Sequence, residues 1–380
     1  GRATHPAGTQ PPEGVMTSPL FIWSIPMKNG RSLVALATEL ERQLASKRDM
    51  IVPTGLMHHE TAADGSTRIR VETPDGMKTY PTTELFRRQV ADKLKIPFAY
   101  FERMRNEQAP LLDRNVDTWL HHEPELRMVR TLDGQARAFL SDRYRRLDNY
   151  DLCEHVLPML QRLPDARFES TELTPTRLYL KVVTPRVQIE IQPGDIVQAG
   201  VVISNSEVGQ GTLSVQPLVY RLICRNGLIA ADRAMRKTHV GRMSDASSDE
   251  VTVFRDDTLQ AEDKAFFLKV RDVVEAAVSE ATFQQIAEKM RRTMGIRLKG
   301  DPVRTIEVVG TRYLLNEGER SGLLRHLIEG GDLSAYGLVN AVTHFAQDVD
   351  DYDRATEFEA LGGRLLEQSK AEWDTLAEAA

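Results

Sequence analysis

"RVQIEIQPGDIVQAGVVISNS", residues 186–206, lies between two stretches of the same kind, and the three together decide the fold. The flanking stretches are "RFESTELTPTRLYLKVVTP" (167–185) and "GTLSVQPLVYRLICRNGLI" (211–229), and the three hold most of the β-branched runs of the chain. Such runs, bounded by turn signals like Asn226-Gly227, are typical of strands. Because helices do not alternate with them, the centre of the chain is predicted to be a mainly antiparallel sheet.

Helices are expected on both sides of this centre, and hairpins on its N-terminal side. Toward the N-terminus, apolar spacing and capping residues predict helices over 31–47, 82–97, 97–110 and 110–122, and a helix that enters near Asn149 and contains Pro158. Trp119 falls at the helical spacing of its apolar neighbours. Hairpins are predicted around 74–76 and 132–134. From about residue 257 the pattern is helical, with Thr282 as a second N-cap.

This order predicts an α+β fold, with a mainly antiparallel β-rich centre flanked by helices and a helical C-terminal third. Three parts are expected along the chain. Residues 1–17 form a disordered leader rich in Pro, Gly and Thr, residues 18–255 form the α+β core domain, and residues 256–380 form a helical region with an acidic tail.

The composition is that of an ordinary folded protein, with 380 residues, 41% apolar and 27% charged. The sequence has neither a run of about 18 apolar residues nor a signal-peptide pattern, so a cytoplasmic location without a membrane partner is predicted. Cys153 and Cys224 have apolar neighbours and are expected to be buried thiols. The net charge of −6 is concentrated in residues 345–380, which carry ten acidic and three basic residues.

Several common catalytic motifs are missing. The sequence contains no phosphate-binding "GxxxxGK[ST]", no "GxGxxG" between a strand and a helix, and no zinc-binding "HExxH". His58-His59 and His121-His122 are adjacent pairs, whose side chains point in different directions and rarely bind one metal ion together. No metal and no cofactor are therefore expected.

The stretch "ISNSEVGQG" (203–211) is a candidate site at the end of an apolar strand. Its one carboxylate, Glu207, could accept a proton or bind a hydroxyl group or a metal ion. The alternative is a structural turn, in which Asn205 and Ser206 bond backbone groups and the glycines permit a tight reversal.

Two basic clusters are candidate phosphate-binding surfaces. One of them uses arginine rather than lysine throughout, and arginine binds phosphate with two parallel hydrogen bonds and stacks on flat rings, which favours recognition over solubility. For the other, solvated surface charge is the alternative. The first cluster belongs to residues 127–146, the second to residues 220–242. The candidate nucleic-acid contacts are Arg130, Arg137, Arg143, Tyr144, Arg145, Arg146, Arg221, Arg225, Arg236, Lys237, His239 and Arg242.

In the connection from a strand that ends near Ser141 to the helix near Asn149, Asp142 and Asp148 could instead neutralise two of the arginines 143, 145 and 146. Tyr150 and Tyr220 are further aromatic candidates for stacking beside arginines.

Several motifs in the same order resemble one protein family. They are "IPFAYFERM", "VRTLDGQARAFLSDRYRRLDN", "GVVISNSEVGQGTLSV", "YRLICRNGLI", "THVGR" and "AVTHFAQDVDDYDRATEFEALGGRLL". From about residue 80 to 370 the chain is similar to the phage- and plasmid-borne proteins grouped as domain of unknown function 932. The resemblance implies a mobile-element context and DNA metabolism, and it names no catalytic residue.

Three functions from different classes remain open. The leading hypothesis is a DNA-associated protein without catalysis, which binds or anneals single-stranded DNA in recombination or replication. A protein-interaction factor in defence or counter-defence is the second, with a host protein as partner and the acidic tail as its natural feature. The third is a metal-dependent nuclease centred on Glu207, with Asp195, Asp142 and His239. The sequence also leaves an oligomer open.

Overall fold

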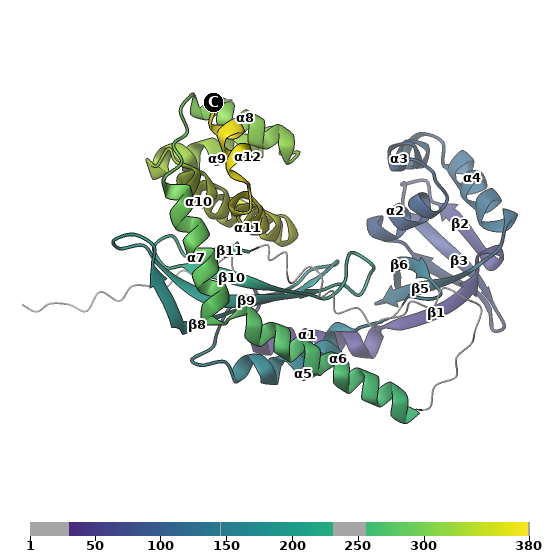
Figure 1. The fold of residues 1–380 in the computed structure, drawn as a ribbon. Coiled ribbons are helices and arrows are strands. Elements are labelled where there is room, and N and C mark those ends of the chain that lie inside the picture. The colour runs from purple at the N-terminus through teal and green to yellow at the C-terminus, as the bar shows by residue number, and fades with distance from the viewer. Residues whose placement is uncertain (1–29, 145, 231–255, 379–380) are drawn as a thin grey trace, which may run out of the picture.

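The computed structural model describes residues 30–144, 146–230 and 256–378. Residues 48–141 form an N-terminal lobe of two three-stranded sheets, with strand orders β1-β5-β6 and β2-β3-β4, and three α-helices (Figure 1). Its elements are β1 (Arg48–Pro53), η1 (Thr54–Leu56), β2 (Met57–Thr61), β3 (Thr67–Thr73), β4 (Gly76–Pro81), α2 (Glu84–Lys93), α3 (Phe98–Glu107), α4 (Ala109–His122), β5 (Leu126–Leu132) and β6 (Gln135–Ser141).

Local sequence explains these elements. The Thr83 side chain accepts the Phe86 N–H and so caps α2. Asp133 and Gly134 both have positive φ in the turn that joins β5 to β6, and short polar residues and glycine tolerate that conformation best. Both predicted hairpins and the predicted early helices are confirmed.

The three β-rich stretches form a five-stranded central sheet of order β11-β10-β9-β8-β7, and all of its ladders are antiparallel. Its strands are β7 (Arg167–Leu173), β8 (Leu178–Glu190), β9 (Ile196–Asn205), β10 (Ser214–Arg221) and β11 (Asn226–Ile229). Nearly all of β9 is buried, which explains why its sequence is a continuous apolar run rather than an alternating one.

Three helices cover one face of the central sheet, below it in Figure 1. They are α1 (Leu33–Ser46), α5 (Asn149–Gln161) and α6 (Asp256–Ala277). Leu36, Val156 and Val270 of these helices share a hydrophobic core with Leu180 and Val201 of the sheet. Residues far apart in the sequence therefore meet under the same strands, because each apolar helix face needs a sheet to cover it.

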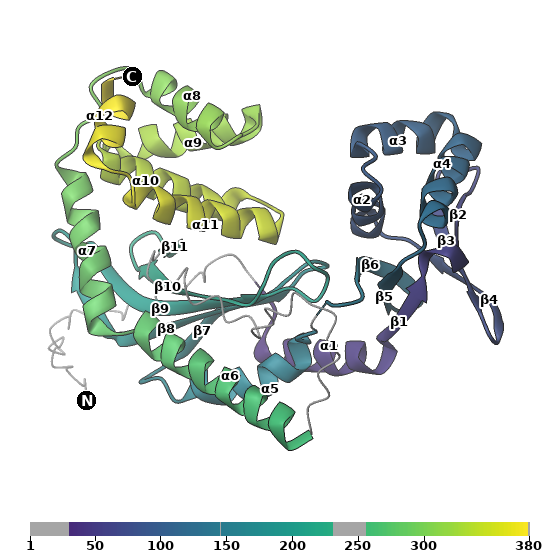
Figure 2. The ribbon, with the colours of Figure 1, turned by 45° about the vertical axis from the view of Figure 1, so that its right-hand side comes forward.

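The C-terminal helices stand mainly at the β11 end of the sheet and share a core with it through Val219 and Leu228. They are α7 (Glu280–Met294), α8 (Pro302–Arg312), α9 (Glu317–Gly330), α10 (Ala335–Phe345), η3 (Ala346–Asp348), α11 (Tyr352–Leu366) and α12 (Lys370–Glu378). Figure 2 shows these helices and the N-terminal lobe rising from the same side of the central sheet, at its two ends.

The α+β fold, the antiparallel β-rich centre and the helical C-terminal third are thus confirmed. Thr282 is not an N-cap, since Ser279 caps α7 by accepting the Thr282 N–H. None of the described helices is long and apolar enough to cross a bilayer. The leader 1–17 and the boundary at 255/256 involve residues outside the described ranges, so the predicted division into domains stays a prediction.

Candidate functional site

Glu207 lies two residues after the end of β9, in the loop that joins β9 to β10 within the central sheet. The Ser206 hydroxyl accepts the N–H groups of Val208 and Gln210, and Gly209 and Gly211 have φ of +78° and +121°. These contacts fold the chain back and turn Glu207 inward, where only 3% of it is exposed. The structural role expected for Ser206 is confirmed. Asn205 instead bonds the Leu147 carbonyl and the Asn149 side chain at the start of α5.

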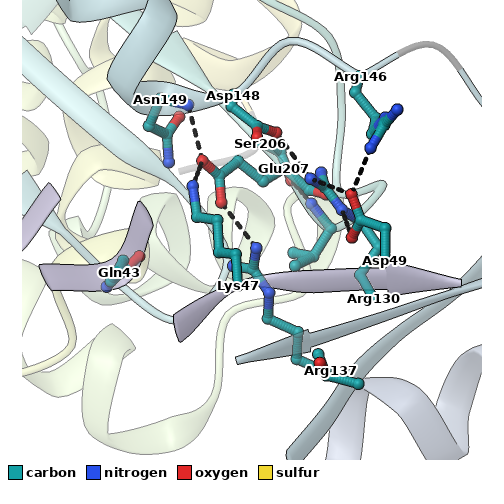
Figure 3. A network of polar contacts seen from close by, with 12 residues as sticks. Gln43, Lys47, Asp49, Arg130, Arg137, Arg146, Asp148, Asn149, Ser206 and Glu207 are labelled. Atoms are coloured by element: carbon teal, nitrogen blue, oxygen red, sulfur yellow. Dashed lines mark hydrogen bonds and ion pairs between the residues drawn. The ribbon is translucent and has the colours of Figure 1, made fainter. Parts of the chain in front are cut away.

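The Glu207 carboxylate holds together segments that are far apart in the sequence (Figure 3). One oxygen accepts from Lys47 Nζ at 2.5 Å and from the Asn149 N–H at 2.7 Å, and the other from Arg137 Nη2 at 2.9 Å. Burial by itself raises the pKa of this carboxyl, but the charges of Lys47 and Arg137 and the bonds to it hold the pKa below its ordinary value. Glu207 is therefore a charged, internally neutralised anchor between α1, β6 and α5.

Arg130 is a second anchor beside it, with no exposed surface. Its Nη1 donates to the Glu207 carbonyl at 2.7 Å, its Nε to Asp49 at 2.9 Å, and its Nη2 to Asp148 at 2.7 Å. Arg146 approaches the same Asp49 from outside at 2.8 Å. We call this set the Glu207 network: Lys47, Asp49, Arg130, Arg137, Arg146, Asp148, Asn149 and Glu207 (Figure 3).

A cavity of about 760 Å³ borders the Glu207 network. We call it the interlobe cavity, because its walls come from the N-terminal lobe, from turns of the central sheet and from the start of α11. It is lined by Gln43, Thr83, Glu84, Leu85, Arg88, Leu132, Asp133, Gln135, Arg137, Asn149, Leu173, Thr174, Pro175, Thr176, Arg177, Glu207, Val208, Gln210, Asp351 and Asp353.

The charged groups of this cavity differ in how far they are already engaged. Asp133 is paired with Arg42 at 2.8 Å, and Asp353 accepts hydroxyl groups from Thr176 and Tyr179 at 2.6 and 2.8 Å. Arg137, by contrast, has a buried Nε without a hydrogen-bond partner among the described residues. A buried unsatisfied donor is costly, so an acceptor that reaches this wall of the cavity would be stabilised there.

The structure divides the first predicted basic cluster. Arg130 is buried and Arg137 is mostly buried, so the expectation that both lie on an open surface is wrong. Arg143 is exposed, and Tyr144 is half-buried with its hydroxyl donated to the Ser206 carbonyl.

Arg146 is paired with Asp49, and Arg145 lies outside the described residues. Asp148 neutralises Arg130, and Asp142 bonds the Ser141 hydroxyl; among the described residues neither acid has an ion pair with Arg143 or Arg146.

The second cluster lies elsewhere in the fold. Arg221 forms a two-bond ion pair with Asp195, which also accepts the Tyr336 hydroxyl, and Arg225 lies in the turn before β11 with a positive φ. Tyr220 is buried in the sheet. Arg236, Lys237, His239 and Arg242 lie outside the described residues.

Three further predictions concern Tyr150, the cysteines and the nuclease site. Tyr150 packs against the core under the central sheet. Cys153 is buried as expected, whereas Cys224 is only partly buried. Glu207 and Asp195 belong to separate networks, and within residues 30–144, 146–230 and 256–378 no three His, Cys, Asp or Glu side chains are placed to hold a metal ion.

Sequence reasoning did not find Lys47 or Asp49 as partners of this site, nor Arg88 and Arg177 as cavity residues. Lys47 and Glu207 are 160 positions apart, and no local pattern marks such a pair. In the sequence Arg177 stands in a stretch that predicts strands, and nothing there marks it as a cavity residue. In the structure its guanidinium donates to the Gln210 carbonyl at the cavity wall. Both contacts are tertiary: Lys47 meets Glu207 where the chain enters the N-terminal lobe, and Arg177 meets Gln210 where two loops of the central sheet lie together.

Fold and site together define an α+β protein in which a buried ion-pair network joins two parts of the chain and borders a polar cavity. The chain belongs to the family described as a domain of unknown function, DUF932, whose match covers residues 138–366. The match begins at β6, so most of the N-terminal lobe precedes it. No curated protein and no solved structure matches the chain.

Proposed function

We propose that this protein binds single-stranded nucleic acid without catalysis, as a DNA-associated factor of a mobile element that acts in recombination or replication. The observation that carries the proposal is Arg137, which one carboxylate holds in the wall of the interlobe cavity while its buried Nε is left without a partner among the described residues. A phosphate oxygen is an acceptor that this guanidinium can bind.

The proposed interface is smaller than the sequence suggested, and partly different. Arg137 lies inside the cavity, Arg88 and Arg177 line it, and Arg143 extends the surface from the adjoining connection, where Leu85 and Val208 of the cavity wall pack with Tyr144. Arg130 and Arg221 are left out, because neither lines the cavity and carboxylates already neutralise both within the protein. The contact is therefore expected to involve few phosphates.

A protein-interaction role through the acidic tail has weaker support. Several acids of residues 345–380 are engaged within the fold: Asp348 with Arg325, Glu357 with Arg354, Glu359 with Lys181, and Glu367 with Lys289. An acidic surface whose charges are paired internally offers less attraction to a basic partner.

Titrations of the full chain with a fluorescent single-stranded oligonucleotide, followed by anisotropy at several salt concentrations, test the proposal. We expect binding that persists in a chelator. Arg88→Gln, Arg143→Gln and Arg177→Gln should each weaken binding, and each lost phosphate contact should reduce the slope of log affinity against log salt by about 0.7.

Arg186→Gln is the matched control, since Arg186 of β8 is 67% exposed, forms its ion pair with Asp165 and does not line the interlobe cavity. It should leave affinity and slope unchanged. If the unmodified protein does not bind at low salt, the function is disproved. If the protein binds but none of Arg88→Gln, Arg143→Gln and Arg177→Gln changes the salt slope, the proposed site is disproved. Cleavage that depends on a divalent ion would favour the nuclease.

A further inference from the structure

A second groove, of about 710 Å³, lies at the other end of α2, on the N-terminal lobe. Two large aromatic side chains line it while remaining exposed: Trp119 of α4 by 52% and Tyr100 of α3 by 45%. We call it the aromatic groove; its lining is Thr54, Lys93, Leu94, Lys95, Ile96, Pro97, Tyr100, Asn115, Trp119, Leu120, His122, Glu123 and Glu125.

The exposure of Trp119 departs from the pattern of its helix. Leu112, Val116 and Leu120 form the buried stripe of α4 at a spacing of four residues, whereas Trp119 projects beside that stripe. Its ring lies edge-on to the His122 ring, at a centroid distance of 5.8 Å. An indole ring exposed to water lacks much of the hydrophobic stabilisation that burial supplies. A complex in which a partner covers the ring would therefore be stabilised.

The charges of the groove leave one cation available. Lys93 is neutralised by Glu125 at 2.6 Å, while Lys95 has no ion pair with any other described residue. Glu123 also lines the groove, so the site as a whole is not strongly basic. Two exposed aromatic rings beside one lysine without an ion pair among the described residues are suited to stack on flat, uncharged rings of a ligand next to a single phosphate. A site that bound its ligand by charge alone would need more basic residues.

The aromatic groove and the interlobe cavity are bordered by the same helix. Leu85 and Arg88 of α2 line the cavity, Lys93 lines the groove, and the ten residues of α2 span about 15 Å. Between them the Arg88 guanidinium covers the Phe98 ring at 4.0 Å. Figures 1 and 2 both show α2 between the central sheet and α3. One extended single strand of nucleic acid can thus follow α2 from the interlobe cavity to the aromatic groove.

We infer that the aromatic groove is a stacking platform for unpaired nucleobases, with Trp119 and Tyr100 as the stacking rings and Lys95 as the phosphate contact. This inference rests on the proposed binding of single-stranded nucleic acid and locates its bases. It replaces the tyrosines expected from the sequence, because Tyr144, Tyr150 and Tyr220 all pack against the protein itself.

Tryptophan fluorescence tests the inference with an oligo(dT) probe. The chain has three Trp residues, and Trp373 is 2% exposed. Because Trp23 lies outside the described residues, the experiment uses a Trp23→Phe background: stacking should quench its emission, and adding Trp119→Phe should abolish that quenching. Trp119→Ala should weaken binding roughly tenfold and leave the salt slope unchanged, because stacking releases no counterions.

Leu111→Ala is the matched control, since Leu111 is an exposed apolar residue of the same helix that does not line the groove. Its affinity should equal that of the unmodified protein. Binding that depends on Arg88 and Arg177 but shows no quenching and no loss in Trp119→Ala would overturn the aromatic groove and leave the cavity intact. Quenching that persists in Trp119→Phe would overturn it as well.

Discussion

Two buried ion-pair junctions attach other parts of the chain to the central sheet, and they are built differently. At the N-terminal lobe, Glu207 meets Lys47, Arg137 and a backbone N–H. At the C-terminal helices, Glu359 of α11 meets Lys181 of β8 at 2.6 Å, and Lys181 also donates to Thr356 at 3.0 Å. Both carboxylates are almost fully buried.

The difference appears in the pKa values of the two carboxyl groups. Burial raises the pKa of Glu359, and the attraction of a single lysine does not reverse the shift. Burial also opposes the charge of Glu207, but two cations and an N–H bring its pKa below the ordinary value. The Glu359 pair is sealed between helix and sheet, whereas Glu207 borders a cavity and holds Arg137 toward it. The Glu359 junction therefore stabilises the fold, whereas the Glu207 junction stabilises the fold and also positions a side chain in the wall of the cavity.

Lys181→Met should have the largest effect on stability. It leaves Glu359 buried without a cation, and the expected loss in the free energy of unfolding is about 3–5 kcal/mol. Urea denaturation of the full chain measures it. The double variant Lys181→Met/Glu359→Leu should recover most of the loss, because no uncompensated charge remains. A single variant as stable as the unmodified protein would contradict a sealed pair.

Glu207→Gln should cost less, about 2 kcal/mol, because Arg137 and position 207 itself line a cavity that water can enter, so the charges left unpaired there can be partly solvated. The same denaturation experiment compares the two junctions directly. A loss larger than that of Lys181→Met would show that the Glu207 junction is the more tightly sealed of the two.

The Glu207→Gln comparison also has an expected pH dependence. The pKa of Glu207 is lower in the folded chain, so its stabilisation is complete above the unfolded value of about 4.3 and is lost as the pH falls through the folded value. The stability difference between the unmodified chain and Glu207→Gln should therefore be constant near neutral pH and shrink in acid. A difference that grows in acid would contradict the lowered pKa.

Arg146→Gln should have the smallest effect, below about 1 kcal/mol. Its side chain is 55% exposed, and Asp49 keeps its contact with Arg130 when Arg146 is removed. Thermal unfolding at low and high salt measures the change, which should be smaller still at high salt. A loss comparable to that of Glu207→Gln would place Arg146 among the anchors of the network rather than at its edge.

Local sequence predicted the fold class well and the site only in part. The hairpins at 74–76 and 132–134 follow from turn chemistry, and the helix at 84–93 from a threonine cap, all within a few residues of the chain. The alternative structural reading of Ser206 also proved correct for the same local reason.

Predictions that depended on exposure were less successful. Arg130 reads like any other arginine of its cluster, yet β1, the Glu207 loop and the start of α5 enclose it and supply acceptors for its donors. Trp119 reads like a core residue at helical spacing, yet it lies beside the buried stripe of α4 and lines a groove. Burial depends on which surface packs against an element, and spacing along one element does not contain that information.

The sequence by itself determined the α+β order of elements, the antiparallel centre and the turns, because propensity, capping and periodicity act over a few neighbouring residues. Only the tertiary structure decided which charges are neutralised and which remain available. Lys47 and Glu207 are separated by 160 positions, and Lys181 and Glu359 by 178. Their attraction depends on a distance and a local dielectric that exist only once the lobe and the helices have packed on the sheet.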